Sequence, residues 1–566
     1  MEESRPEREY ELPRECWEKI VSFLHPHHLD SLSLVNKLFL SITNSHRTHF
    51  SCLSPTFDPS SLLRRFPNIT SLCLPAYHGT LLPLLPNLAS LSLPDSDGFP
   101  LPHSPGPFPK LKSLLLPRLG TLRDHDLRGI SRCFPLLEEL GVSYPRDGSV
   151  TDWGLMHSLL KLKRLRKIDL SGNVFVSDIV VECLSANFPE LREIWVKDCF
   201  LVSEKCISEL VRNRPDLEGL HVSNFGYPAV SSEVTGGFRF ARGLKSLGLL
   251  SSFVTDDFFG VLADANLPLR ELLLPYSNGF TFDGLMELLM NCREIEVLDL
   301  KGASFLSDDR VAGLCRVLGN LISVDFSECR GLTDGILHSL ARHCPLLREV
   351  RMDGLVAVGR ADKSELQMDP STNNGNPNIG VNCMLNFLSL AKASSLNDHF
   401  LKDISHMFLN LQHLDISNCG KITEESLSTI LNGCGKILHL DISLCPGIVN
   451  FPPDMDDLNL EVLVAQGVGF DCTDLGVIAR RCPRLRRIDL KSCRKVTTPG
   501  VKQLVSSCKL LREVSLQWCN NVDVEVVAWM IFKRPSLRRI VPPKGLVLSK
   551  NQKSFFLRHG CLVRDG

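Results

Sequence analysis

Short segments of the form L-x-x-L-x-L recur along most of the chain, separated by about 26 residues, as in LREIWV at 191–196 and LEGLHV at 217–222. The alternation of apolar and other residues predicts a short strand with one buried face in each segment. Nine regular copies lie between 137 and 352 and seven between 385 and 542, and three less regular copies begin at 69, 88 and 111. This makes about 19 copies. Such a period and consensus are the signature of leucine-rich repeats, in which each unit supplies one strand and one helix.

The second half of nine units carries a helix-start signal, a Ser, Thr or Asn that is followed by an acidic residue. These residues are Thr151, Ser177, Ser203, Thr255, Ser307, Thr333, Asn397, Thr423 and Thr473. A side-chain oxygen at this position accepts from the free N–H groups of the first turn, and the following acid favours the positive end of the helix dipole. We therefore expect a helix after each strand.

A stack of such units must bend, because parallel strands lie about 4.8 Å apart whereas helices with their side chains are about 10 Å wide. The expected fold is α/β: a curved solenoid with a concave parallel sheet inside and helices outside, over residues 66–542. Nineteen strands would give an inner arc of roughly 90 Å, enough to hold a folded protein. One interval lengthens, and residues 361–382 form a polar insertion that we expect to be either a loop excursion or a lid.

The repeats also carry a recurring cysteine, as in the pattern L-x-x-L-D-L-S-x-C at Leu411–Cys419. Varied copies end at Cys199, Cys329, Cys445, Cys493 and Cys519. This pattern resembles the cysteine-containing subtype of leucine-rich repeats and covers residues 130–540. The resemblance implies an F-box protein, because the subtype is common in that family.

Residues 11–50 do not fit the repeat and predict a separate module of three short helices. Trp17, Ile20, Val21 and Leu24 are spaced to share one helix face, and His25-Pro26 ends that helix. About 40 residues so rich in Leu, Val and Phe can hardly bury all of them, which indicates an apolar surface awaiting a partner. A cap for the solenoid is the alternative, but residues 51–65 are expected to be a linker that separates the module from the first regular strand.

This module closely resembles an F-box through Leu12-Pro13, Ile20, Leu24, Leu29 and the run Leu32–Lys37. The segments Glu15–Glu18 and Phe39–Asn44 resemble those of plant F-box/leucine-rich-repeat proteins in particular. The resemblance implies docking on a Skp-type adaptor that links the chain to cullin and RING subunits. It carries the adaptor contact, or its immediate support, over to the matching positions. These are Leu12, Pro13, Ile20, Leu24, Leu29, Leu34 and Val35.

Composition changes this picture little. The formal net charge is −1, and we expect neither nucleic acid nor membrane as a partner. The start of the chain lacks the apolar core of a signal peptide, and no run of about 18 apolar residues occurs, so we expect a protein of the cytoplasm, the nucleus or both. The 21 cysteines lie at repeat positions without a C-x-x-C pair, which favours reduced core thiols over a zinc site.

Specificity should lie on the concave surface, at the residue between the last two apolar positions of each strand. Many of these residues are Asp, which suits the repeat consensus; Trp195, His221, Leu273 and Arg351 are exceptions and the candidates for substrate binding. No catalytic set, metal site or cofactor motif stands out. The repeats predict a surface that binds a protein, and the resemblance to an F-box implies a non-catalytic substrate-recognition subunit of a ubiquitin ligase. We also expect a disordered start at 1–10 and a C-terminal cap at 543–566. A repeat scaffold or inhibitor without ligase activity, and a hormone-sensing F-box receptor, remain alternatives.

Overall fold

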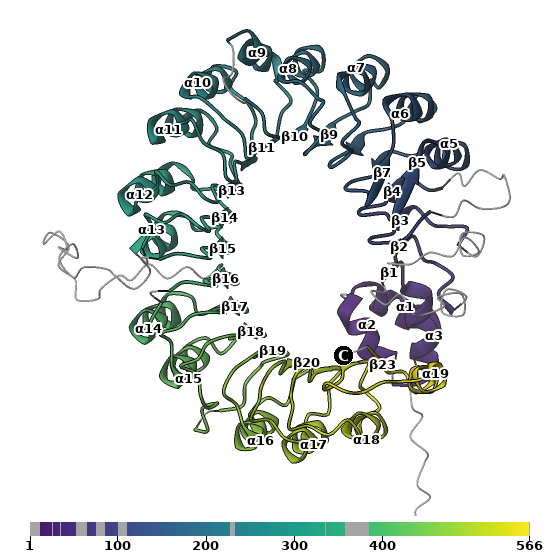
Figure 1. The fold of residues 1–566 in the computed structure, drawn as a ribbon, viewed down its shortest axis with the longest axis vertical. Coiled ribbons are helices and arrows are strands. Elements are labelled where there is room, and N and C mark those ends of the chain that lie inside the picture. Colours follow the sequence, from purple (N-terminus) through teal and green to yellow (C-terminus); the bar gives the residue numbers. More distant parts are fainter. Residues whose placement is uncertain are drawn as a thin grey trace, which may run out of the picture. The chain divides into compact units, whose positions relative to one another are not determined.

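The computed structural model describes residues 12–24, 26–33, 35–51, 65–74, 85–99, 110–226, 232–333, 335–356, 384–394, 396–454 and 456–564. The chain divides into two compact units. Unit 1 comprises residues 1–226 and 231–244, and unit 2 comprises residues 227–230 and 245–566. Both consist of strand-and-helix repeats, and unit 1 also carries the N-terminal helices (Figure 1).

In unit 1, each strand of the main sheet pairs in parallel with the next one along the chain. The strands are β1 (His49–Ser51), β2 (Ser71–Cys73), β3 (Ser90–Ser92), β4 (Ser113–Leu115), β6 (Glu139–Gly141), β8 (Lys167–Asp169), β9 (Glu193–Val196) and β10 (Gly219–Ser223). A separate parallel pair is formed by β5 (Thr121–Arg123) and β7 (Asp147–Ser149).

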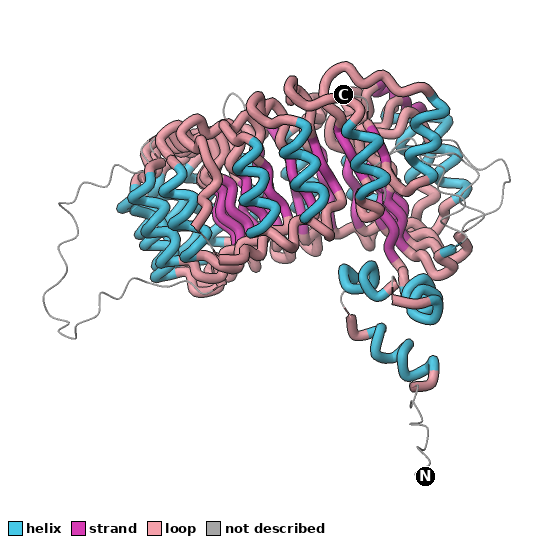
Figure 2. The backbone as a smooth tube through the Cα atoms, turned by 90° about the horizontal axis from the view of Figure 1, so that it is seen from below, coloured by secondary structure: helices cyan, strands magenta, loops and turns pink. Residues whose placement is uncertain are grey.

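Unit 2 continues the same pattern with parallel, sequentially paired strands. They are β11 (Ser246–Leu250), β12 (Glu271–Leu273), β13 (Val297–Asp299), β14 (Ser323–Asp325), β15 (Glu349–Arg351), β16 (Phe387–Ser389), β17 (His413–Asp415), β18 (His439–Asp441), β19 (Val462–Val464), β20 (Arg487–Asp489), β21 (Glu513–Ser515), β22 (Arg539–Val541) and β23 (Leu562–Val563). In each unit the strands form one layer and the repeat helices the other (Figures 1 and 2).

The α/β repeat fold expected from the sequence is confirmed. Each of the 19 L-x-x-L-x-L segments contains one strand, from β2 to β22 apart from β5 and β7. The central residue of the strand is buried in each unit, as with Leu91 and Leu414, because alternate side chains of a strand point to opposite faces. Two flanking strands, β1 and β23, lack the repeat motif and were not expected.

The helices follow the strands. Unit 1 has α1 (Arg14–Ser22), α2 (Pro26–Leu32), α3 (Lys37–His46), α5 (Asp124–Cys133), α6 (Asp152–Leu159), α7 (Asp178–Asn187), α8 (Glu204–Asn213), α9 (Ser232–Gly236) and the 3-10 helix η2 (Gly237–Phe240). Unit 2 has α10 (Asp256–Asp264), α11 (Phe282–Asn291), α12 (Asp308–Val317), α13 (Gly335–His343), α14 (Asp398–Met407), α15 (Glu424–Gly433), α16 (Cys472–Arg481), α17 (Thr498–Ser507), α18 (Val526–Lys533) and α19 (Lys550–Arg558). Among the described helices, none combines the length and the apolar character needed to span a bilayer.

Most of the expected helix caps are present, and Thr151, Ser203, Thr255, Asn397 and Thr423 accept from a first-turn N–H group. The prediction for Thr473 was wrong, because α16 is capped two residues earlier by Asp471. The Asp471 carboxylate accepts from the N–H groups of Thr473 and Asp474, and the Thr473 hydroxyl itself donates to Asp471 over 2.7 Å. A carboxylate is the stronger acceptor, so it takes the capping position.

The acidic residue at the start of a helix does more than favour the helix dipole. The Asp398 carboxylate accepts from the Thr423 N–H group over 2.9 Å and from the Thr423 hydroxyl over 2.8 Å, and Thr423 caps the next helix. The same arrangement joins Asp124 to Thr151 and Asp256 to Thr281. These bonds form a carboxylate ladder that ties each helix start to the following one.

The repeat cysteines form a second link between neighbouring repeats. The Cys445 thiol donates to the Ile416 carbonyl over 3.1 Å, and the Cys519 thiol donates to the Leu490 carbonyl over 3.0 Å. The cysteines in the described residues carry free thiols, and most are buried. Cys199, Cys329, Cys419, Cys445, Cys493 and Cys519 each donate in this way to a carbonyl of the preceding repeat.

The insertion at 361–382 and residues 1–10 lie outside the described residues, and so does nearly all of the expected linker at 51–65. Strands β15 and β16, on either side of the insertion, still pair in register, with Val350 opposite Leu388. At the C-terminal end, β23 extends the sheet by pairing with β22.

Candidate functional site

The N-terminal helices α1, α2 and α3 form a small module with its own core. Val21, Leu29 and Ile42 are buried there, with Trp17 and Leu32 packed against them. The rings of Trp17 and Phe39 meet edge to face at 4.9 Å between centroids. Asn36 caps α3, its side chain accepting from the Phe39 N–H group over 2.8 Å. Three short helices are therefore held by very few buried side chains.

The apolar face predicted for α1 splits in two. Trp17 and Val21 turn inward, whereas Ile20, 43% exposed, and Leu24 lie at the surface. Phe23 is 77% and Val35 64% exposed, and Leu12 and Leu38 are exposed as well. Such a density of exposed large apolar side chains in so short a module is typical of a surface that a partner covers.

The structure places the predicted adaptor residues differently from one another. Leu12, Ile20, Leu24 and Val35 are exposed, Pro13 precedes the first residue of α1, and Leu34 lies outside the described residues. Leu29 belongs to the core and so acts as support beneath the surface. The sequence reasoning missed Phe23 and Leu38, which follow the same apolar series but were not assigned to a face.

The module is joined directly to the first repeat. Strand β1 follows α3 and pairs with β2, His49 opposite Ser71. The Asn68 side chain donates to the Ser45 carbonyl over 2.8 Å, and the Phe50 and Phe66 rings lie 5.8 Å apart. Module and repeats are thus neighbours in space, whatever the length of chain between them.

The face of the sheet opposite the repeat helices is called the inner face below. On it, each three-residue strand presents two side chains, one on either side of the buried central residue. The sequence reasoning considered the second of these only, and the first was missed. The missed row includes Lys167 and Glu193 in unit 1, and Phe387, His413 and His439 in unit 2. Counting outward on both sides of the buried leucine would have found them.

The aspartates of the second row hold turns. In unit 1 the Asp169 carboxylate accepts from the Ser171 N–H group, and in unit 2 Asp299 and Asp415 accept from the N–H groups two residues further on, each over 2.9 Å. These bonds fix the chain where it leaves the strand. These consensus aspartates therefore have a structural role.

Two of the four predicted substrate residues lie together in unit 1. Trp195 on β9 is partly exposed, and its ring packs against His221 on β10 at 4.7 Å between centroids. His221 is 6% exposed, and burial, with Lys197 nearby, lowers its pKa to about 4. His221 is therefore a neutral ring that backs Trp195, and Trp195 is the residue of the pair that faces the surface.

The other two lie in unit 2, on strands separated by β13 and β14. Leu273 is half-buried on β12. Arg351 on β15 pairs with Glu349 over 2.7 Å and lies over the Phe387 ring at 4.5 Å. Next along the sheet come His413, stacked on Phe387 at 6.0 Å, and His439, at 5.4 Å from His413. Arg351 thus begins a row of rings rather than standing alone.

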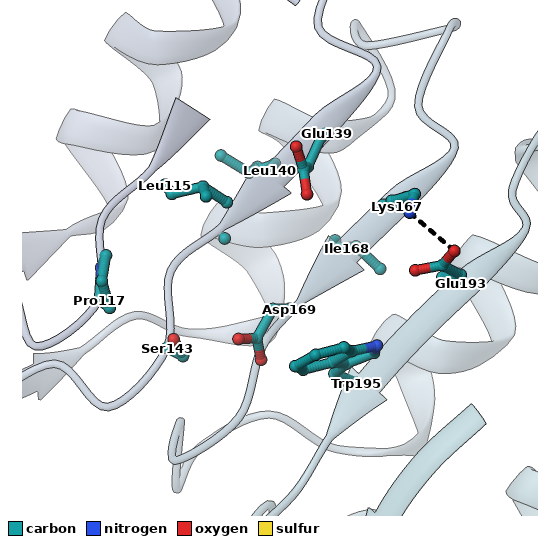
Figure 3. A pocket seen from close by; sticks show the side chains of 11 residues that line it. Leu115, Pro117, Glu139, Leu140, Ser143, Lys167, Ile168, Asp169, Glu193 and Trp195 are labelled. Carbon is teal, nitrogen blue, oxygen red and sulfur yellow. Dashed lines mark ion pairs between the residues drawn. The ribbon is translucent and has the colours of Figure 1, made fainter. Parts of the chain in front are cut away.

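A cavity of about 210 Å³ lies on the inner face of unit 1 (Figure 3). Its lining comes from β4, β6, β8 and β9 and the turns after them: Leu115, Pro117, Glu139, Leu140, Gly141, Ser143, Lys167, Ile168, Asp169, Glu193 and Trp195. The Lys167 ammonium pairs with the Glu193 carboxylate over 2.7 Å, and this bond raises the pKa of Lys167. Cavity and Trp195 together form a candidate binding feature on this inner face.

Metal chemistry finds no support in the part of the chain that the structure describes, where no group of three or more His, Cys, Asp or Glu side chains is placed to hold an ion. What the arrangement offers is binding: an exposed apolar surface on the N-terminal module and a notched inner face on the repeats.

Comparison with known proteins finds similarity in the N-terminal module and over longer stretches of the chain. Residues 10–51 match the family model described as the F-box domain. F-box/LRR-repeat protein 4 of Bos taurus is 34% identical over 142 residues, which cover 24% of this chain and 22% of that protein. GRR1-like protein 1 of Arabidopsis thaliana is 22% identical over 57% of this chain and 51% of its own length.

F-box protein MAX2 homolog A of Petunia hybrida is 26% identical over 43% of this chain and 38% of that protein. The chain spans between about a fifth and about half of the length of these curated relatives.

Proposed function

The chain is an F-box protein with leucine-rich repeats, and from this premise we propose that it is the substrate-recognition subunit of a ubiquitin ligase of the Skp-adaptor, cullin and RING type. In this role the F-box binds the adaptor and the repeats bind a protein substrate. Catalysis of ubiquitin transfer belongs to other subunits, and this chain contributes proximity and orientation.

The observation that carries the proposal is the exposed apolar surface of the F-box. Ile20, Leu24, Phe23 and Val35 are exposed although the module has only a small core. Covering apolar surface contributes about 25 cal/mol per Å², so a partner that buries these side chains gains substantial binding energy. The direct pairing of β1 with β2 supports a fixed connection between the adaptor-binding part and the first repeat.

We propose that the protein works in the cytoplasm, the nucleus or both. The free thiols among the described cysteines support a reducing compartment, since disulfides form and persist in oxidising ones.

The test is co-expression of the full chain with a Skp-type adaptor, followed by purification through a tag on the adaptor. Wild-type chain should co-purify. The double variant Ile20→Asp with Leu24→Asp should be lost, because two carboxylates would have to be desolvated in the apolar interface. Both positions are exposed, so the folded chain tolerates the charges.

Ile179→Asp is the matched control, since Ile179 is 53% exposed on α7 of the repeats and far along the sequence from the F-box. The control should co-purify like wild type. Retention of the double variant at wild-type level contradicts the proposed adaptor contact. A scaffold without ligase activity would instead predict that deleting residues 1–50 leaves the abundance of the bound partner unchanged.

A further inference from the structure

The cavity on the inner face of unit 1 exists because one residue of a row is missing its side chain. Along the second row of inner-face positions, Leu115, Gly141, Asp169 and Trp195 occupy successive paired strands. Gly141 lies between Leu115 and Asp169, and a Cβ atom built on it would lie 2.9 Å from Leu115 Cδ2. The end of the Leu115 side chain leans toward this position, and the cavity, called the notch below, lies over Gly141 between Leu115 and Asp169 and extends to Trp195. Figure 3 shows Leu115, Asp169 and Trp195 around it.

The far wall of the notch is aromatic and held in place. Trp195 packs on the buried His221 ring at 4.7 Å, and the Lys197 ammonium lies 5.1 Å from the Trp195 ring centroid. A ring contacted by both neighbours keeps one orientation. Trp195 therefore offers a preorganised apolar wall, the kind of anchor that contributes most to binding energy at interfaces.

The size of the cavity favours a single side chain as its occupant. Its volume of about 210 Å³ lies below the about 300–1,000 Å³ typical of pockets that enclose drug-sized ligands. Its lining residues come from consecutive strands and the turns after them, so the sheet closes it from one side. A side chain presented by a larger molecule fits this shape, because the rest of that molecule lies along the inner face.

The charges around the notch define the neighbouring group of the occupant. The lining includes the carboxylates of Glu139, Asp169 and Glu193 and one ammonium, that of Lys167. Lys167 pairs with Glu193. Glu139 accepts from the Ser113 hydroxyl over 2.6 Å and shares the Lys167 ammonium electrostatically with Glu193, and among the described residues no ion pair is formed by Asp169. Three carboxylates thus surround one ammonium. A positive charge next to the apolar group would complement this surplus of carboxylate.

We propose that this notch receives one large apolar side chain from an extended segment of the substrate protein, with a Lys or Arg adjacent to it. The apolar side chain sits in the space left by Gly141 against Trp195, and the basic group reaches Glu139 and Asp169. This assignment rests on the proposed function, because it identifies the substrate class that the repeats present to the ligase.

The experiment selects peptides with the purified full chain from a displayed library of random short peptides. The expected result is enrichment of Leu, Ile, Met or Phe directly beside Lys or Arg. The strongest enriched peptide is then labelled with a fluorophore, and its dissociation constant is measured for each variant by anisotropy.

Gly141→Leu fills the notch and should weaken the labelled peptide by roughly thirty-fold, the scale of losing one anchoring contact. The backbone at Gly141 permits a side chain, and the nearest atom is the far end of the flexible Leu115 side chain. Ser515→Leu adds the same side chain at the same register position of β21 in unit 2 and should leave affinity unchanged.

Charge reversal gives an independent readout. In a selection with the Glu139→Lys and Asp169→Lys double variant, the enriched neighbour should change from basic to acidic. Absence of apolar-basic enrichment with the wild-type chain, or unchanged affinity in Gly141→Leu, overturns the proposal. Direct binding of free aromatic amines to the wild-type chain, without any peptide enrichment, also overturns the proposal. That outcome identifies a small-molecule site.

Adaptor co-purification of the same variants separates this inference from the proposed function. Gly141→Leu should retain the adaptor, which also verifies that it folds. If the wild-type chain does not co-purify with the adaptor but still enriches the peptides, the ligase role is refuted. The notch then remains assigned as a peptide site.

Discussion

Single buried donors join several repeats to the one before. At one recurring position of the repeat the donor is a thiol, as in the bond from Cys445 to the Ile416 carbonyl. In an earlier repeat, Asn173 stands at the same position. The Asn173 amide donates to the carbonyls of Val142 and Leu170 over 2.9 and 2.8 Å. Cysteine and asparagine are alternatives here because both carry a short donor that reaches a buried carbonyl.

Replacing Cys445 by Ala should lower the free energy of unfolding by about 1–2 kcal/mol, since the Ile416 carbonyl loses its thiol donor and a small space opens. Cys183→Ala, at a half-buried position on α7, should change it by about 0.5 kcal/mol or less. Urea unfolding followed by circular dichroism measures both. Equal effects of the two substitutions would speak against the role assigned to the thiol.

The half-buried carboxylate of Asp299, in the second row of inner-face positions, makes stability depend on pH. Burial, with Asp325 nearby, raises the pKa of Asp299 to about 6. A raised pKa means that the folded chain binds the proton more tightly than the unfolded chain, so this group stabilises the fold as pH falls from 7 toward about 4.

Asp299→Asn should therefore stabilise the chain at pH 7, by about 1–2 kcal/mol, and this advantage should shrink as the pH approaches 4. The amide oxygen still accepts from the Lys301 N–H group, so the turn is kept. The comparison is the difference in urea midpoint between variant and wild type across this pH range. A difference that does not vary with pH contradicts the raised pKa.

Between elements, the carboxylate ladder couples the start of one helix to the next. Asp398 at the start of α14 accepts from Thr423 at the start of α15 and also from the Ser426 hydroxyl. Helix starts carry free N–H groups that need acceptors, and here a side chain of the preceding unit fixes the residue that supplies them. The ladder gives each helix a defined register against its neighbour.

Asp398→Ala should cost about 2–3 kcal/mol of unfolding free energy, because it removes several hydrogen bonds from a partly buried site. Asp403→Ala on the same helix removes only an exposed ion pair with His399 and should cost about 0.5 kcal/mol or less. Thermal unfolding of the two variants decides the matter. If the carboxylate ladder contributes no stability, the two variants will unfold at the same temperature.

Strands and helices were predictable from the sequence wherever a periodic pattern marked them. The L-x-x-L-x-L segments gave their strands because alternation fixes which residue is buried. β1 and β23, like β5 and β7, were missed because none of them carries the L-x-x-L-x-L motif. Thr473 misled because two capping residues stand close together, and only the geometry decides between them.

The site was predictable to a lesser degree. Trp195 stood out as an unusual inner residue, but the sequence could not show that His221 would be covered by it. The notch depends on Gly141, a residue without chemistry of its own, placed between Leu115 and Asp169 by strand pairing. A cavity arises from what neighbouring strands leave empty, and one-dimensional patterns do not record that.

At the scale of the whole molecule, the proposed role requires that adaptor binding and substrate binding occur on one chain. A reporter protein carrying the selected peptide should be degraded faster in cells that express the wild-type chain. The Ile20→Asp and Leu24→Asp double variant should still bind the reporter but leave its lifetime unchanged. Cycloheximide chase measures the lifetime, with Ile179→Asp expected to act like wild type.

Pulldown of the reporter with each variant completes that experiment. Faster reporter loss with the double variant would separate degradation from the F-box. Faster loss with Gly141→Leu would separate it from the notch.

The in-register pairing of β15 with β16, with more than 30 residues between them, identifies a permissive position in the chain. Closure of a longer loop costs little, because the entropy grows only with the logarithm of its length. A fluorescent protein or an affinity peptide inserted near residue 371 should therefore leave the array assembled. The chain can thus be labelled internally, for imaging or capture in cells, with both its F-box and its terminal strand left unmodified.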